Sequence, residues 1–157
     1  MATLEVGDRA PAFTLPDQDG EKVRLTAYGG SPVVVYFYPK ANTGGCTTQS
    51  CNLRDAEPGL SALGASVVGI SPDRPEAQKK WDDKHEFGFP LLSDPNHAIA
   101  DKYGVWGTKK LYGREYEGII RSAFVVDGSR KIAGAFYKVS PKQTVTKVLS
   151  VLEDLQP

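Results

Sequence analysis

Three short runs of β-branched and aromatic residues constrain the fold of this 157-residue chain more than any other feature. They lie at residues 33–38, 67–70 and 123–126. Each run is too short for a typical helix and has no polar face, a pattern typical of strands buried on both faces of a sheet. We therefore predict a central sheet that contains these three strands.

The segments between and after these runs have helical spacing. Residues 47–63 predict a helix, in which the proline at the centre of residues 57–59 should cause a bend or a break. Residues 75–87 predict a polar helix with proline near its start, and residues 141–155 predict a final amphipathic helix. An Asp-Gly pair at residues 127–128, between two strand-like pieces, predicts a hairpin.

Strands that alternate with helices, followed by a hairpin and a last helix, predict a three-layer α/β/α domain with a central mixed sheet. The chain has no internal repeat or low-complexity tract, so we predict one domain over residues 1–157. A right-handed crossover through the helix at 47–63 would make the first two strands parallel. The loop after residue 38 then lies at the carboxyl end of a strand, where sites in such sheets cluster.

The balance of charge narrows the class of partner. The chain has 19 Lys and Arg residues against 19 Asp and Glu residues, so we expect no global attraction to nucleic acid or to an anionic membrane. No apolar run approaches the ~18 residues of a membrane span, and the N-terminal segment lacks the apolar core of a signal peptide. We expect a soluble, cytoplasmic protein with a small or neutral partner.

The two cysteines of the chain, Cys46 and Cys51, both follow the first predicted strand. In a reducing compartment, a close cysteine pair indicates redox or metal chemistry more often than a static disulfide. A thiol with the ordinary pKa of about 8.5 is only ~3% ionised at neutral pH, so a thiolate nucleophile needs stabilising groups. We expect Cys46 in the first helical turn, where unpaired N–H groups face the sulfur. Thr43 is the expected hydroxyl donor and Arg121 the expected cation, with Arg54 as the local alternative.

The five-residue spacing of the cysteines limits when they can react with each other. On an intact helix, residues five apart have Cα atoms roughly 8.7 Å apart and point about 140° away from each other. A disulfide needs a Cα separation below about 7 Å. The two thiols therefore cannot bond until at least one turn of the helix unwinds, and the poor helix formers around them make that change inexpensive.

Other interpretations remain open at this stage. The cysteines could be buried core residues of a module that binds a protein or a small ligand. Pro39 could mark only a strand-to-helix turn, Thr43 a helix cap and Arg121 a surface position. A zinc site lacks a second ligand pair, since His85 and His97 do not have finger spacing. A disulfide reductase of the thioredoxin type would use C-x-x-C, which this chain lacks.

The combination Pro39-x-x-x-Thr43-x-x-Cys46 resembles the active-site motif of the peroxiredoxins, which are thiol peroxidases on a thioredoxin-like fold. With Cys51 and with Arg121 ahead of a late strand, the chain is most similar to the Q-type group, also called the bacterioferritin comigratory proteins. The opening VGDRAPAFTLPDQDG and the segment GVWGTKKLYGREYEGIIRSAFVVD are similar to this group as well. The resemblance thus spans nearly the whole chain.

This resemblance implies a role for each residue of the motif. Cys46 would be the peroxidatic nucleophile and Cys51 the resolving thiol. Thr43 would hydrogen-bond the thiolate and the peroxide, Pro39 would shield the pocket, and Arg121 would hold the peroxide and favour the thiolate.

Three positions depart from the usual pattern of the group. Gly44 stands where the group often has proline, which should loosen the loop. Ala123 stands where a hydroxyl residue is common after the arginine, which removes one pocket hydrogen bond. Gln49 stands where other peroxiredoxins often have an acid or a histidine, and its contribution is left open.

The resemblance also implies an activity and its partners. Hydrogen peroxide and organic hydroperoxides would be reduced through a Cys46 sulfenic acid, which Cys51 resolves as an intramolecular disulfide. Thioredoxin or a similar dithiol would reduce that disulfide, in antioxidant defence and redox homeostasis. No metal, haem, flavin or other cofactor is implied. Because the resolving thiol lies in the same chain, one reason to dimerise is removed and a monomer is expected.

Overall fold

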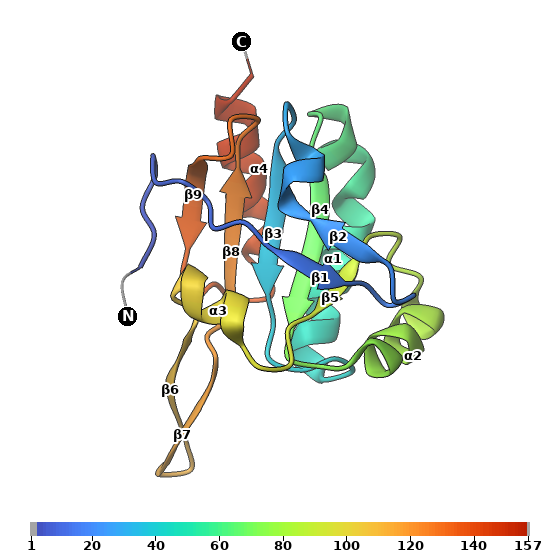
Figure 1. The fold of residues 1–157 in the computed structure, drawn as a ribbon, viewed down its shortest axis with the longest axis vertical. Helices are drawn as coiled ribbons and strands as arrows, with labels where there is room; N and C mark the ends of the chain where they lie inside the picture. The colour runs from blue at the N-terminus through green and yellow to red at the C-terminus, as the bar shows by residue number, and fades with distance from the viewer. Residues whose placement is uncertain (1–2, 157) are drawn as a thin grey trace.

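The computed structural model describes residues 3–156. The elements, labelled in Figure 1, follow one another as β1 (Thr14–Pro16), β2 (Lys22–Arg24), the 3-10 helix η1 (Leu25–Tyr28), β3 (Val33–Phe37), α1 (Gly44–Ala62), β4 (Ser66–Ser71), α2 (Pro75–His85), β5 (Leu91–Ser93), α3 (Ala98–Tyr103), β6 (Trp106–Leu111), β7 (Arg114–Ile119), β8 (Ser122–Val126), β9 (Ile132–Phe136) and α4 (Thr144–Asp154). All three predicted strands and all three predicted helices are present, with ends within a few residues of those expected. Within this range, no helix is long and apolar enough to span a membrane.

Five strands form the central sheet in the order β5-β4-β3-β8-β9. β3 and β5 each pair in parallel with β4, whereas β8 is antiparallel to both β3 and β9. The sheet is therefore mixed, with a parallel β3-α1-β4 crossover and a β8-β9 hairpin, as the sequence predicts. Two further pairs, β1-β2 and β6-β7, form small sheets of their own.

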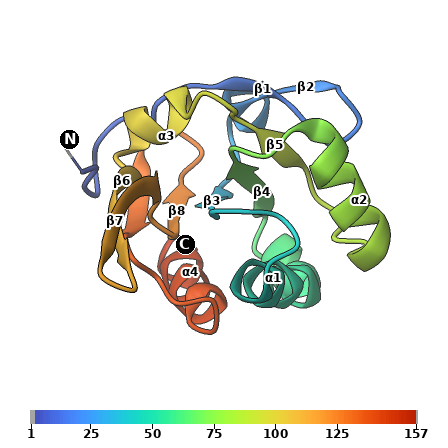
Figure 2. The ribbon, with the colours of Figure 1, turned by 90° about the horizontal axis from the view of Figure 1, so that it is seen from below.

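Helices cover both faces of the central sheet. Figure 2 shows α1 and α4 on one face, α3 with the β1-β2 pair on the other, and α2 beside β5. Side chains of β3 alternate between two hydrophobic clusters, with Val34 and Tyr36 facing α1 and α4 while Val35 and Phe37 face α3. This two-sided burial explains the unbroken apolar run of β3 and confirms the three-layer α/β/α class.

The expected break in the cysteine-bearing helix is absent. α1 runs without interruption from Gly44 to Ala62 and contains Pro58 in its interior. Proline removes one helical hydrogen bond and crowds the preceding turn, at a cost of about 3 kcal/mol. Leu53 and Leu60, on either side of Pro58, are both completely buried in the core. Their packing holds the last turn in place, so of the bend or break predicted here the break does not occur.

We expect Pro58→Ala to raise the free energy of unfolding by about 2 kcal/mol, because the restored N–H can bond in the helix while the unfolded chain gains some freedom. Urea unfolding of the reduced protein measures this change. Pro75→Ala is the matched control, since Pro75 is the first residue of α2, where its missing N–H would be unpaired anyway. Equal midpoints for Pro58→Ala and the unaltered protein would contradict the expectation.

The β6-β7 hairpin was not predicted from the sequence. It extends away from the central sheet (Figure 1), and its strands join through a two-residue turn at Tyr112 and Gly113, with φ of 53° and 78°. Such turns usually contain Asn-Gly or Asp-Gly, because both residues need positive φ. Tyrosine at the first position concealed the hairpin, although the glycine marks the turn.

Candidate active site

Strand register brings two distant parts of the chain to one end of the sheet. Phe37, the last residue of β3, pairs with Ser122, the first residue of β8. The strands are antiparallel, so the loop that leaves β3 and the residue that precedes β8 lie at the same end. That loop enters α1, and the preceding residue is Arg121. The fold therefore places Arg121 beside the first turn of α1.

Cys46 lies in that first turn, and its sulfur faces Arg121. The Arg121 Nη2 atom donates to Cys46 Sγ over 3.4 Å. Cys46 is only 1% exposed, and both it and Cys51 are free thiols. A cation and the positive end of a helix thus meet at one buried sulfur.

Gln49 holds the guanidinium of Arg121 in place. The Arg121 Nη1 atom donates to Gln49 Oε1 over 2.9 Å, and Gln49 Nε2 donates to Thr144 Oγ1 over 3.0 Å. Thr144 Oγ1 donates in turn to the carbonyl of Ser140, so its oxygen is left to accept from Gln49. These hydrogen bonds fix the orientation of the Gln49 side-chain amide, so that its oxygen faces Arg121 and its nitrogen faces Thr144. The sequence left the role of Gln49 open, and the available signal was its position three residues after Cys46 on one helix face.

Gly45 leaves room for the close approach of Arg121. A Cβ atom at this position would lie 3.1 Å from Arg121 Nη2, closer than nearly all Cβ contacts. The absent side chain therefore leaves space for the guanidinium against the first turn of α1.

Replacing Gln49 with leucine should slow the oxidation of Cys46 by peroxide about tenfold. The substitution removes one of the two hydrogen bonds that orient Arg121, a loss of about 1.4 kcal/mol in the transition state. Pre-steady-state thiol oxidation with hydrogen peroxide measures the rate. Gln143→Leu is the control, since Gln143 is exposed and its side chain makes no contact with Arg121. A Gln49→Leu rate equal to that of the control would contradict the positioning role.

Thr43 and Pro39 lie in the segment between β3 and α1. Thr43 is exposed at the N-cap of α1, and its hydroxyl donates to the Lys40 carbonyl over 2.9 Å rather than to Cys46. Pro39 is half-buried just after β3. The segment is close to the thiol along the chain, but in this state its hydroxyl is directed to the backbone.

Arg54, the alternative cation, points elsewhere. Its Nε atom pairs with Asp55 over 3.0 Å, and its Nη1 atom donates to the His85 carbonyl over 2.8 Å. The hydrogen bond to Asp55 raises the pKa of Arg54 above its ordinary value. Of the two arginines considered, only Arg121 contacts Cys46.

Cys51 lies one and a half turns further along the unbroken α1 and is half-buried. Between the two cysteines, Ser50 shares a buried hydrogen bond of 2.7 Å with the hydroxyl of Tyr36 in β3. Burial raises the pKa of Tyr36 well above the usual range, so this phenol stays protonated. The bond therefore ties the segment between the two thiols to the central sheet.

A basic pocket of about 400 Å³ reaches Arg121 from the side of the β6-β7 hairpin. It is lined by Thr108, Lys109, Lys110, Ile120, Arg121, Lys138 and Val139. The Lys109 ammonium donates to the Ile119 carbonyl over 2.8 Å. The pKa of Lys109 is lowered, mainly by burial and to a smaller extent by repulsion from Arg121. The pocket gives a solvent-side approach to Arg121.

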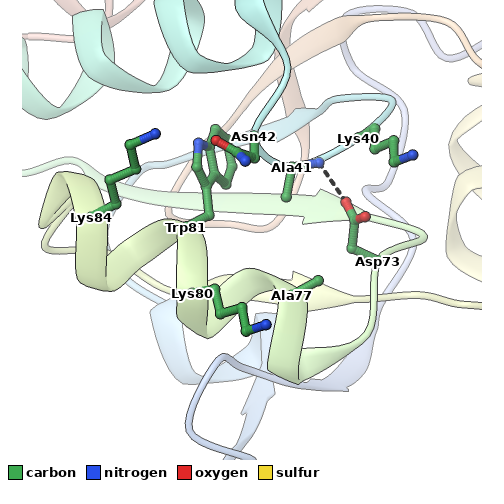
Figure 3. A pocket seen from close by; sticks show the side chains of 8 residues that line it. All are labelled: Lys40, Ala41, Asn42, Asp73, Ala77, Lys80, Trp81 and Lys84. Carbon is green, nitrogen blue, oxygen red and sulfur yellow. Dashed lines mark hydrogen bonds between the residues drawn. The ribbon is translucent and has the colours of Figure 1, made fainter.

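A second hollow, of about 340 Å³, lies between the loop after β3 and α2, and its lining includes three lysines and Trp81 (Figure 3). Neither cysteine lines it. The backbone N–H of Ala41 donates to Asp73 Oδ2 over 2.7 Å, and the Ser71 hydroxyl donates to the same oxygen. Asp73 therefore anchors the loop that leads from β3 into α1. Among residues 3–156, no group of three His, Cys, Asp or Glu side chains is placed to hold a metal ion.

A thioredoxin-like sheet with a buried, arginine-paired thiol at the start of its first crossover helix defines a cysteine-based redox protein. Comparisons with known proteins agree with this class. The model of the AhpC/TSA family matches residues 6–135. The chain belongs to the AhpC/TSA family of peroxiredoxins, within the Bcp/PrxQ group.

Curated relatives and solved structures support the assignment to this group. The chain is 46% identical to the putative peroxiredoxin bcp of Haemophilus influenzae over 155 residues, which cover 99% of this chain and 100% of that protein. It is 48% identical to peroxiredoxin Bcp of Escherichia coli over 136 residues, or 87% of each. Peroxiredoxin Q of Xanthomonas campestris superposes with a TM-score of 0.87 at 32% identity, covering 98% of both chains. The chain is therefore a thiol peroxidase of the peroxiredoxin type.

Proposed function

We propose that the chain reduces hydrogen peroxide and organic hydroperoxides, with Cys46 as the peroxidatic thiol and Cys51 as the resolving thiol. One observation carries the proposal: the Arg121 guanidinium lies 3.4 Å from the sulfur of Cys46, which is buried in the first turn of α1. This pairing places a cation next to the sulfur that would attack the peroxide, where it can offset developing negative charge.

The first step oxidises Cys46 by two electrons. The thiolate attacks one peroxide oxygen, the O–O bond breaks, and the departing oxygen takes a proton to leave as water or alcohol. Arg121 offsets the charge that develops on the oxygens. Thr43 acts here if its hydroxyl turns from the Lys40 carbonyl towards the peroxide, and Pro39 limits the access of water to the sulfur. A sulfenic acid remains on Cys46.

Organic hydroperoxides fit a shallow pocket next to the thiol. This pocket, of about 270 Å³, is lined by Gly45, Thr48, Ser140, Pro141 and Lys142. Gly45 directly precedes Cys46, and the Pro141 ring offers an apolar surface for an alkyl group. The bacterioferritin comigratory protein of Xanthomonas campestris, which is 31% identical to this chain, has alkyl peroxide reduction activity.

The second step joins the two thiols of one chain. On the intact α1 their Cα atoms are roughly 8.7 Å apart, too far for a disulfide, so the turn between Cys46 and Cys51 has to unwind. The Cys51 thiolate then attacks the Cys46 sulfur, the S–O bond breaks, and the hydroxide leaves with a proton as water. A dithiol such as thioredoxin reduces the disulfide by exchange. Since both sulfurs come from one chain, we propose a monomer, which acts in the cytoplasm.

Counting thiols after a single dose of peroxide tests this function. We expect equimolar hydrogen peroxide to remove both free thiols within seconds, and the denatured, non-reduced product to remain one chain that has lost two hydrogen atoms. The Cys46→Ser variant should keep its remaining thiol under the same treatment. Survival of both thiols for minutes in the unaltered protein would refute the proposal, and a cross-linked pair of chains would refute the intramolecular resolution.

A further inference from the structure

The side chain of His85, at the end of α2, faces the resolving thiol. Its Nδ1 atom lies 3.9 Å from Cys51 Sγ, although the two residues are 34 positions apart in the chain. This contact has no part in the oxidation of Cys46. It places an imidazole nitrogen beside Cys51, the thiol that would react only after the sulfenic acid has formed on Cys46.

The imidazole of His85 is held in a defined orientation. It stacks on Phe87 with ring centroids 5.4 Å apart, and it meets Trp81 in a T-shaped arrangement with ring centroids 6.5 Å apart. Both neighbouring rings are only 1% exposed. The His85 carbonyl also accepts a hydrogen bond from Arg54 over 2.8 Å. These contacts from α1, α2 and the following loop keep Nδ1 directed at Cys51.

Several charged groups around this corner have partners other than the ring of His85. Arg54 is bonded to Asp55 and is electrostatically coupled to Glu86. Asp82 accepts hydrogen bonds from the Phe87 N–H and from Gln18. Lys84 lines the hollow shown in Figure 3. No hydrogen bond joins these carboxylates to Nδ1, and in the tautomer that carries its proton on Nε2 the lone pair of Nδ1 faces the Cys51 S–H.

We propose that His85 is the general base of the resolving step. The proposal rests on the proposed function, because it assigns a role only if Cys51 attacks a sulfenic acid. The Cys51 proton moves to Nδ1, the thiolate sulfur attacks the Cys46 sulfur, and the S–O bond breaks. The leaving hydroxide receives the proton back from the imidazolium, so the products are one disulfide and one water. Leu53, completely buried two residues after Cys51, keeps this part of α1 beside His85 while the turn towards Cys46 unwinds.

The first test isolates the Cys51 thiol from the peroxidase reaction. In a Cys46→Ser background, we expect His85→Gln to slow the alkylation of Cys51 by iodoacetamide at pH 7 by about tenfold, since a free thiol is mostly protonated there. The difference should disappear near pH 9.5, where a thiol ionises without a base. His97→Gln is the matched control, because the other histidine of the chain stacks on Trp106. Equal alkylation rates at pH 7, or a deficit of the same size at both pH values, would overturn the proposal.

The second test follows disulfide formation after one equivalent of hydrogen peroxide in chains that keep both cysteines. We expect His85→Gln to form the sulfenic acid at the rate of the unaltered protein but to close the disulfide about 10²-fold more slowly at pH 7. Raising the pH should restore the rate. Unchanged closure at pH 7 would overturn the role of His85. Failure of the proposed function is distinguishable, because the unaltered protein would then form no disulfide at all.

Discussion

Replacing Arg121 with leucine should lower the second-order rate of Cys46 oxidation by hydrogen peroxide about 10²- to 10³-fold. The guanidinium donates directly to Cys46 Sγ. Its removal takes away the only side chain seen to donate to this sulfur among residues 3–156, and with it the positive charge beside the reacting atoms. Losses of this size follow from deleting one preorganised donor at a centre of developing charge.

The measurement for Arg121 is stopped-flow oxidation under single-turnover conditions at several peroxide concentrations. The oxidation rate of Arg121→Lys should fall between the rates of the unaltered protein and of Arg121→Leu. Lysine keeps the charge but not the paired donors that reach both Cys46 and Gln49. Arg24→Leu, on the exposed strand β2 far from α1, is the control for a lost arginine. A rate for Arg121→Leu within twofold of the control would show that this contact does not serve catalysis.

Replacing Cys51 with serine should end turnover after a single oxidation. Cys46 still reacts with peroxide at its normal rate, since Cys51 lies away from Arg121 and contacts His85. A serine hydroxyl is a poor nucleophile at neutral pH, so the sulfenic acid on Cys46 stays unresolved. Steady consumption of peroxide with a dithiol reductant should therefore fall to background, which an assay coupled to thioredoxin measures.

The stalled intermediate of Cys51→Ser gives a second readout. Dimedone, which reacts with sulfenic acids, should label this variant after one equivalent of peroxide and should leave the unaltered protein mostly unlabelled. Asn52→Ala serves as the matched control, because it changes the other neighbour of Cys51 and keeps both thiols. Unchanged steady turnover in Cys51→Ser would show that another group, or the reductant itself, resolves Cys46.

Much of the fold could be predicted because the core strands consist of unbroken apolar runs, which indicate that they are buried. The run at β3 has no polar face, which is typical of a strand that is covered on both faces. Elements of weaker pattern were missed for the opposite reason. β7 is largely exposed and polar, and the turn before it begins with a tyrosine, so neither burial nor turn chemistry marked the β6-β7 hairpin.

Some features of the candidate site could also be predicted from the sequence, and others could not. The approach of Arg121 to the thiol could be predicted, because a residue at the entry of an antiparallel neighbour strand lies at the end where β3 finishes. The role of Gln49 could not, since it depends on a hydrogen-bond chain that runs through α4. The Thr43 hydroxyl was expected at the sulfur, but an exposed N-cap residue has a backbone carbonyl within reach as well. Sequence spacing does not choose between two acceptors that both lie three residues away along the chain.

The buried bond between Ser50 and Tyr36 has a consequence for how the enzyme responds to oxidant load. In the proposed mechanism, each catalytic cycle has to detach α1 from the sheet at this point before the disulfide between Cys46 and Cys51 closes. During that delay a second peroxide molecule can reach the oxidised sulfur and carry it to the irreversible sulfinic acid. In that mechanism, the strength of the Ser50–Tyr36 bond would set the peroxide dose at which the enzyme inactivates itself. A weaker contact gives a durable scavenger, and a stronger one gives an enzyme that shuts down early in an oxidant burst.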